Sequence, residues 1–156
     1  MSKMIVFEST VRERKQWVDP CISCQQSHVS IVNQLYLGQA VASEKAAKRA
    51  LQRKLQSYKN QDRKKNIYNE HFITEEELLE KLVISKLKCK YCRANVLLFY
   101  KNVREKKQWT LDRIDNNLGH SNINTVIACL QCNLQRRNTN DKKFLFTKQM
   151  RLIKKY

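Results

Sequence analysis

The residues with the clearest capacity for chemistry are six cysteines, which form three pairs with the same Cys-x-x-Cys spacing. The pairs are Cys21 with Cys24, Cys89 with Cys92, and Cys129 with Cys132. The N-terminus lacks the apolar segment of a signal peptide, so we expect an intracellular, reducing compartment, in which such pairs indicate zinc rather than disulfides. Zinc favours four thiolates in a tetrahedron. We therefore predict one structural zinc ion bound jointly by the second and third pairs.

The first pair has no obvious partner pair. Cys21 and Cys24 could bind a second zinc ion together with the nearby His28 and one further ligand. His71 is another imidazole, but it lies far along the chain from this pair. Two alternatives remain open, namely a pair that binds no metal and a pair that binds metal only across a dimer.

The third pair ends a segment that is rich in further polar ligands. The segment runs from Thr110 to Asn133 and reads TLDRIDNNLGHSNINTVIACLQCN. Asp112 opens a predicted hairpin, Asn124 lies in its middle, and the residues Cys129–Asn133 close it as CxxCN. The segment thus concentrates potential ligands of metals and phosphates in one place.

With a Cys-x-x-Cys pair upstream, this segment resembles the HNH, or ββα-metal, nuclease family. It is most similar to the zinc-stapled branch that includes phage endonuclease VII. Its sequence pattern resembles that of HNH proteins from phages and large DNA viruses. The resemblance covers residues 74–140, less than half of the chain. It implies a small treble-clef-like module in which a β-hairpin and a helix are stapled by zinc.

The resemblance also implies an activity, that of a metal-dependent DNA endonuclease which nicks or cleaves duplex or branched DNA. Asp112 and Asn133 would bind the catalytic Mg²⁺ or Mn²⁺ ion, which stabilises charge on the leaving oxygen. Asn124 would brace the loop between the strands. Arg136 and Arg137 would contact flanking phosphates.

One residue departs from the family pattern. The position after the metal-binding aspartate is usually the histidine that acts as general base, but here it is Arg113. A guanidinium stays protonated and cannot accept a proton. His120 could supply the base instead, or it could be a turn residue, and Arg113 would then contact phosphate or pair with Asp115. If no base is supplied, the alternative is a non-catalytic, zinc-stapled DNA-binding or architectural protein.

The charge of the chain supports a nucleic-acid partner. There are 31 Lys and Arg residues against 14 Asp and Glu residues, a formal net charge of +17. A polyanion offsets such self-repulsion, and DNA is the natural candidate. An RNA-binding module is favoured by basicity alone. No apolar run approaches the ~20 residues that span a bilayer. A homodimer, or a subunit of a larger nucleic-acid assembly in the cytoplasm or nucleus of a host cell, remains open.

The sequence around these residues predicts the elements that must position them, and these elements make an α+β, mostly helical chain. We divide it into an N-terminal segment, a basic helical region and an HNH-like module that ends in a helix, at residues 1–38, 39–73 and 74–156. The basic helix, which includes Lys48 and Arg49, either lies along a phosphate backbone or is simply solvated. Thr74 and Glu77 form a capping-box pattern for a helix that leads into the second cysteine pair. Strands are expected at residues 94–100, 109–114 and 124–130.

Overall fold

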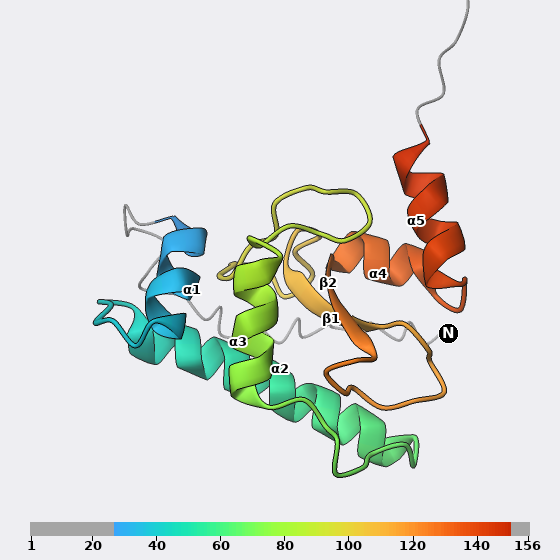
Figure 1. Ribbon diagram of the computed structural model, residues 1–156, viewed down its shortest axis with the longest axis horizontal. Coiled ribbons are helices and arrows are strands. Elements are labelled where there is room, and N and C mark those ends of the chain that lie inside the picture. The colour runs from blue at the N-terminus through green and yellow to red at the C-terminus, as the bar shows by residue number, and fades with distance from the viewer. Residues whose placement is uncertain (1–26, 151–156) are drawn as a thin grey trace, which may run out of the picture.

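The computed structural model describes residues 27–150, and its fold is α+β as predicted (Figure 1). Cys21 and Cys24 lie outside the described residues. Within that part of the chain the elements are α1 (His28–Tyr36), α2 (Glu44–Lys64), α3 (Glu75–Ile84), β1 (Trp109–Arg113), β2 (Thr125–Cys129), α4 (Leu130–Arg136) and α5 (Asp141–Gln149). No described helix is both long and apolar enough to span a membrane.

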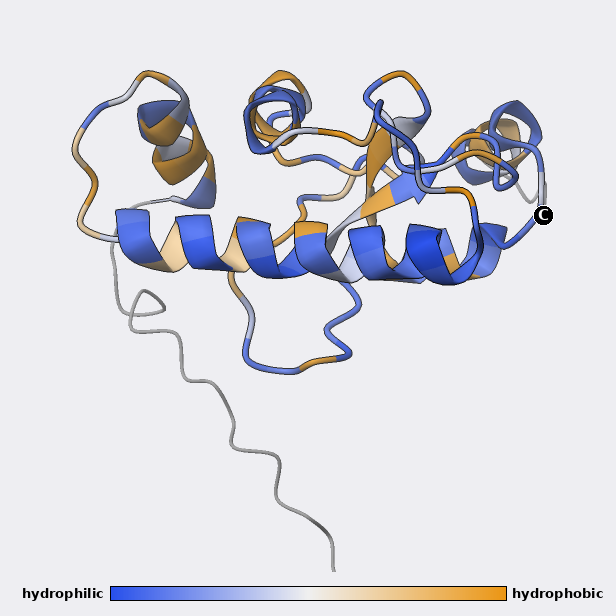
Figure 2. Ribbon diagram, turned by 90° about the horizontal axis from the view of Figure 1, so that it is seen from below, coloured by the Kyte–Doolittle hydropathy of each residue, from blue (hydrophilic) through white to orange (hydrophobic). Residues whose placement is uncertain are grey.

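α2 is the longest described helix and lies along one side of the molecule, in front of the other elements in Figure 2. Its sequence is rich in Ala, Lys, Gln and Arg, which are good helix formers. Only a narrow stripe faces inward, formed by the buried residues Ala47, Leu51, Tyr58 and Asp62. Most of the other residues of the helix are hydrophilic, and blue predominates along its ribbon in Figure 2.

α3 begins with the capping box expected from the sequence. Thr74 Oγ1 accepts a hydrogen bond from the Glu77 amide at 3.2 Å, and Glu77 Oε2 accepts one from the Thr74 amide at 2.9 Å. Leu78 and Leu82 on its inner face are fully buried. The helix therefore has a fixed start and a fixed orientation just upstream of the cysteine at position 89.

β1 and β2 form an antiparallel hairpin in which Trp109 pairs with Cys129 and Arg113 with Thr125. α2 covers the outer edge of β1. There, Tyr58 Oη accepts a hydrogen bond from the Leu111 amide at 3.0 Å, and Lys54 Nζ donates one to the Trp109 carbonyl. Because an open strand edge invites pairing with another chain, this coverage protects the hairpin.

Burial at that edge affects Lys54, whose ammonium lies 4.4 Å from the centroid of the Trp109 ring. Desolvation lowers the pKa of Lys54 to about 7. Trp109 itself, the first residue of β1, is fully buried, so its ring packs in the core.

The strand expected at residues 94–100 does not form. Leu97 makes only an isolated bridge with Gln108, and Lys88 makes one with Asn95. Val96 and Leu98 are nevertheless buried in the core. The apolar run is therefore explained by burial, without the regular pairing of a strand.

One hydrophobic core connects the described segments. It includes Ile31 of α1, Leu51 of α2, Leu82 of α3 and Leu111 of β1. The described part of residues 27–73 therefore packs into the same core as the hairpin module.

Candidate functional site

Two short loops bring four cysteine sulfurs together. The first loop follows α3, and its Lys90 amide bonds to the Ile127 carbonyl of β2 at 2.9 Å. The second loop lies where β2 ends and α4 begins. The sulfurs of Cys89, Cys92, Cys129 and Cys132 all lie within 4.8 Å of one another.

The geometry of this cluster suits a tetrahedral metal ion. The Sγ atoms of Cys92 and Cys129 are 3.9 Å apart, close to the ~3.8 Å edge of a tetrahedron with metal–sulfur bonds of about 2.3 Å. The hydrogen bond from Cys129, together with nearby backbone amides, holds the pKa of Cys89 well below its usual range. The four cysteines could therefore hold a metal ion, as the paired spacing predicted.

The carboxylate of Asp112, on β1, is occupied by other side chains of the same chain. Arg136 Nε donates to Asp112 Oδ2 at 2.6 Å and Arg136 Nη2 donates to Oδ1 at 2.8 Å. Tyr91 Oη donates to Oδ2 at 2.6 Å. Burial first, and then this bond, raise the pKa of Tyr91, so its phenol keeps the proton. Both oxygens of Asp112 thus accept a hydrogen bond from the cationic guanidinium, and Oδ2 accepts a second one from Tyr91.

Arg136 therefore lies in a different place from that expected for a phosphate contact. It is only 1% exposed. Besides Asp112, its guanidinium bonds to the carbonyl of Thr139 at 2.7 Å, to that of Arg113, and to Asn116 Oδ1 at 3.3 Å. These bonds hold the guanidinium in the interior, a position that does not fit the predicted phosphate contact. Arg137, the next residue, is exposed.

Asn133 lies on the same side of the hairpin as Asp112. Its Nδ2 donates to Thr110 Oγ1 at 3.1 Å, and that hydroxyl donates to the Ala128 carbonyl at 2.9 Å. Thr110 and Asp112 are two positions apart in β1, so their side chains point to the same face of the hairpin. The residues as placed do not fit a divalent cation, because Arg136 already supplies a positive charge to the Asp112 carboxylate.

His120 is buried against α2. Its Nδ1 lies 2.7 Å from Asp62 Oδ1, and its backbone amide donates to Asp62 Oδ2 at 2.7 Å. The ring also stacks on Tyr58, with 4.6 Å between centroids. Desolvation lowers the pKa of His120, while Asp62 opposes that shift. These contacts make His120 a residue that joins the hairpin loop to α2.

The rest of the loop supports this junction. A Cβ atom at Gly119 would lie 2.6 Å from the Ile67 carbonyl and 3.0 Å from Asp62 Oδ2, so only glycine fits there. Arg113 donates to the Leu118 carbonyl at 3.2 Å. Its Nη1 lies 3.9 Å from Asp62 Oδ1, so Arg113 pairs with Asp62 and not with Asp115 as expected.

Asn124 makes the backbone contacts that a bracing residue needs. Its Nδ2 donates to the carbonyls of Asp115 and Gly119 at 2.9 and 3.0 Å, and its Oδ1 accepts from the Asp115 amide at 2.9 Å. A single buried side chain thus fixes both ends of the loop that carries His120.

The other expected residues are spread over the surface and the core. Lys48 and Arg49 are exposed on α2, where Lys48 pairs with Glu44 at 2.7 Å. His28 Nδ1 accepts a hydrogen bond from the Leu98 amide at 3.2 Å, and His71 lies exposed, 3.7 Å from Glu70. Asp62 and Tyr91 were not among the predicted site residues. The inward stripe of α2 includes Asp62 at helical spacing and could have indicated its burial.

We expect Asp62→Ala to lower the free energy of unfolding by about 2–4 kcal/mol, because it leaves the His120 amide unpaired and removes the nearest counter-charge of Arg113. Denaturant unfolding measures the loss. Glu70→Ala, which removes an exposed carboxylate, is the matched control and should change little. Equal effects of the two substitutions would show that the Asp62 contacts contribute nothing.

Comparisons with protein-family models, with curated proteins and with solved structures give no match for this chain.

Proposed function

We propose that this protein is a zinc-stapled DNA-binding protein that has the architecture of a ββα-metal nuclease without its hydrolytic centre. The observation that carries the proposal is the bidentate contact of Arg136 with Asp112, at 2.6 and 2.8 Å, inside the module. A guanidinium occupies the carboxylate that a catalytic cation would need.

The chemistry of the neighbouring residues supports the same proposal. Arg113 stands where the family has its general base, and an arginine cannot accept a proton. His120 is the nearest imidazole in sequence, but it is 3% exposed and engaged by Asp62. Neither side chain is available to activate a water molecule.

Zinc is the metal that best fits the cysteine cluster. Four thiolates without an oxygen ligand favour zinc among common cellular divalent ions, and a closed set of four protein ligands is typical of a structural site. The ion would join the loop after α3 to the end of β2. DNA as partner is supported by the net charge of +17.

Endonuclease activity is the second candidate, because one observation favours it. Asp112 and Asn133 lie on the same face of the hairpin, next to each other through Thr110. If Arg136 left the carboxylate, Asp112 could offer a carboxylate oxygen and Asn133 an amide oxygen on this side of the hairpin.

A binding and nicking assay separates the two candidates. We expect the protein to retard duplex DNA, with affinity that falls steeply as salt rises, and to leave supercoiled plasmid intact with Mg²⁺ or Mn²⁺. Asn133→Ala should bind as well as the wild type. If the wild type nicks the plasmid and Asn133→Ala does not, the endonuclease candidate replaces this proposal. If the protein binds no DNA at all, both candidates are refuted.

A further inference from the structure

We propose that the outer face of α2 is the surface that enters the major groove of duplex DNA. This inference rests on the proposed DNA-binding function and names the element that carries it. Five residues at helical spacing, 49, 53, 56, 60 and 64, form a stripe along this face, and all five are exposed.

The charge of this face is of one sign. Its exposed cations are Lys45, Lys48, Arg49, Arg53, Arg63 and Lys64. The helix contains two carboxylates: Glu44 pairs with Lys48 at the N-terminal end, and Asp62 is fully buried and faces the hairpin. Between positions 45 and 64 the helix therefore shows solvent no carboxylate. Such a surface is complementary to phosphates on both sides of a groove.

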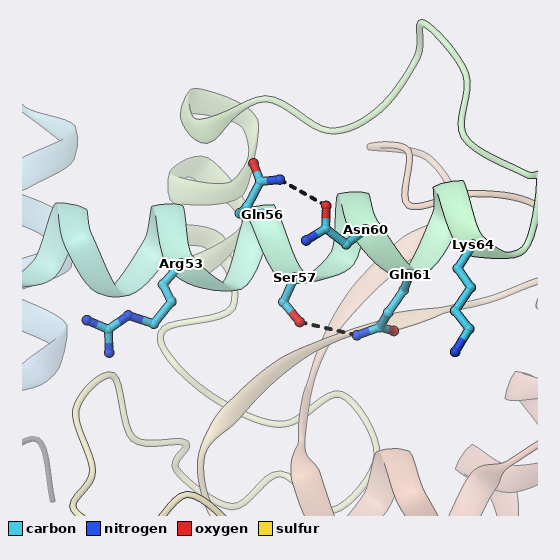
Figure 3. Close-up of a pocket in the computed structure, with 6 residues that line it drawn as sticks. All are labelled: Arg53, Gln56, Ser57, Asn60, Gln61 and Lys64. Carbon is cyan, nitrogen blue, oxygen red and sulfur yellow. Dashed lines mark hydrogen bonds between the residues drawn. The ribbon is translucent and has the colours of Figure 1, made fainter. Parts of the chain in front are cut away.

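Amide side chains occupy the middle of the same face. Gln56 Nε2 donates to Asn60 Oδ1 at 3.0 Å, and Gln61 Nε2 lies 3.5 Å from Ser57 Oγ (Figure 3). These four side chains line a shallow hollow, with Arg53 and Lys64 at its two ends (Figure 3). The cations thus flank a neutral patch that is able to form hydrogen bonds.

The amide pair suits the edge of a base. The Gln56–Asn60 bond uses one amide donor and one amide acceptor, so Gln56 Oε1 can still accept and Asn60 Nδ2 can still donate. Adenine shows an N6 donor beside an N7 acceptor in the major groove. A neighbouring acceptor and donor on one helix face match that pattern.

The dimensions of α2 fit a B-form duplex. Its 21 residues are about 31 Å long, close to one helical turn of DNA, and a helix of about 10–12 Å diameter fits the ~12 Å major groove. The major groove of A-form RNA is too narrow for side chains to read. Tyr58 and Asp62 fix the opposite face to the hairpin loop, so the helix would meet DNA as a rigid element.

The cations are tested with a matched pair of double variants. Arg49→Ala with Lys64→Ala removes two charges from the stripe, and Lys142→Ala with Lys143→Ala removes two exposed charges from α5. The probe is a fluorescent duplex of about two helical turns, titrated by anisotropy over a range of salt. We expect the α2 variant to bind at least about tenfold more weakly, with a salt slope smaller by about 2, and the α5 variant to resemble the wild type.

The amides are tested by sequence preference. We expect the wild type to enrich adenine-containing sites from a random duplex pool. Gln56→Ala with Asn60→Ala should lose that enrichment and keep the salt slope of the wild type. Three results would overturn the inference while leaving nucleic-acid binding intact. The first is an equal affinity of the α2 and α5 variants, and the second is an unchanged sequence preference in the amide variant. The third is tighter wild-type binding to double-stranded RNA or single-stranded DNA. Absence of all binding would refute the proposed function as well.

Discussion

Removing metal from the four-cysteine cluster should unfold the protein. A structural zinc site contributes an apparent ~10–16 kcal/mol, whereas the net stability of a domain is only ~5–15 kcal/mol. The cluster also joins the loop after α3 to the hairpin, next to the buried Tyr91. We therefore expect circular dichroism to show loss of tertiary structure when a strong chelator is added, and recovery when zinc is restored.

The variant Cys132→Ser should have the same effect without a chelator, since its thiol is buried within the cluster. Cys24→Ser leaves Cys89, Cys92, Cys129 and Cys132 unchanged and serves as the matched control, which should keep the zinc bound by these four cysteines. Metal analysis that finds no zinc in the purified protein, or a Cys132→Ser variant as stable as the wild type, would contradict this expectation.

Breaking the pair formed by Asp112 and Arg136 should be the most costly substitution outside the metal cluster. Asp112→Asn leaves a buried guanidinium without its counter-charge, and we expect a loss of about 3–5 kcal/mol in the free energy of unfolding. Arg136→Met leaves the buried carboxylate beside Tyr91 and should cost a similar amount. Denaturant titrations of both variants measure these losses.

A double-mutant cycle sharpens the test. Asp112→Asn combined with Arg136→Met removes both charges, so it should cost clearly less than the sum of the single losses. Arg104→Met, on an exposed arginine, is the control and should cost less than about 0.5 kcal/mol. Additive losses in the double variant would show that the two side chains do not stabilise each other.

Local signals in the sequence predicted the parts of the fold that depend on local physics. The Thr74–Glu77 capping box formed as expected, because both hydrogen bonds lie within one turn. The hairpin and the cysteine cluster followed from spacing. The strand predicted at residues 94–100 is wrong, because its apolar side chains are buried while its backbone makes only isolated bridges, to Gln108 and Lys88.

The candidate site was less predictable, because its contacts join distant segments. Asp62 and His120 are 58 positions apart, and no local pattern pairs them. Arg136 was expected at the surface because it is basic and follows Asn133. It lies one helical turn after Cys132, however, and that spacing places it on the inner face of α4 beside the buried cysteine.

The same helix that we propose to meet DNA also seals the outer edge of β1, through Tyr58 and Lys54. The two roles constrain each other, since α2 cannot swing away toward a ligand without baring a strand that would then recruit a second chain. If α2 contacts DNA as proposed, it would therefore dock as a rigid body, with any adjustment made by the DNA. For the same reason, we expect the hairpin to be poorly stable when it is expressed without α2.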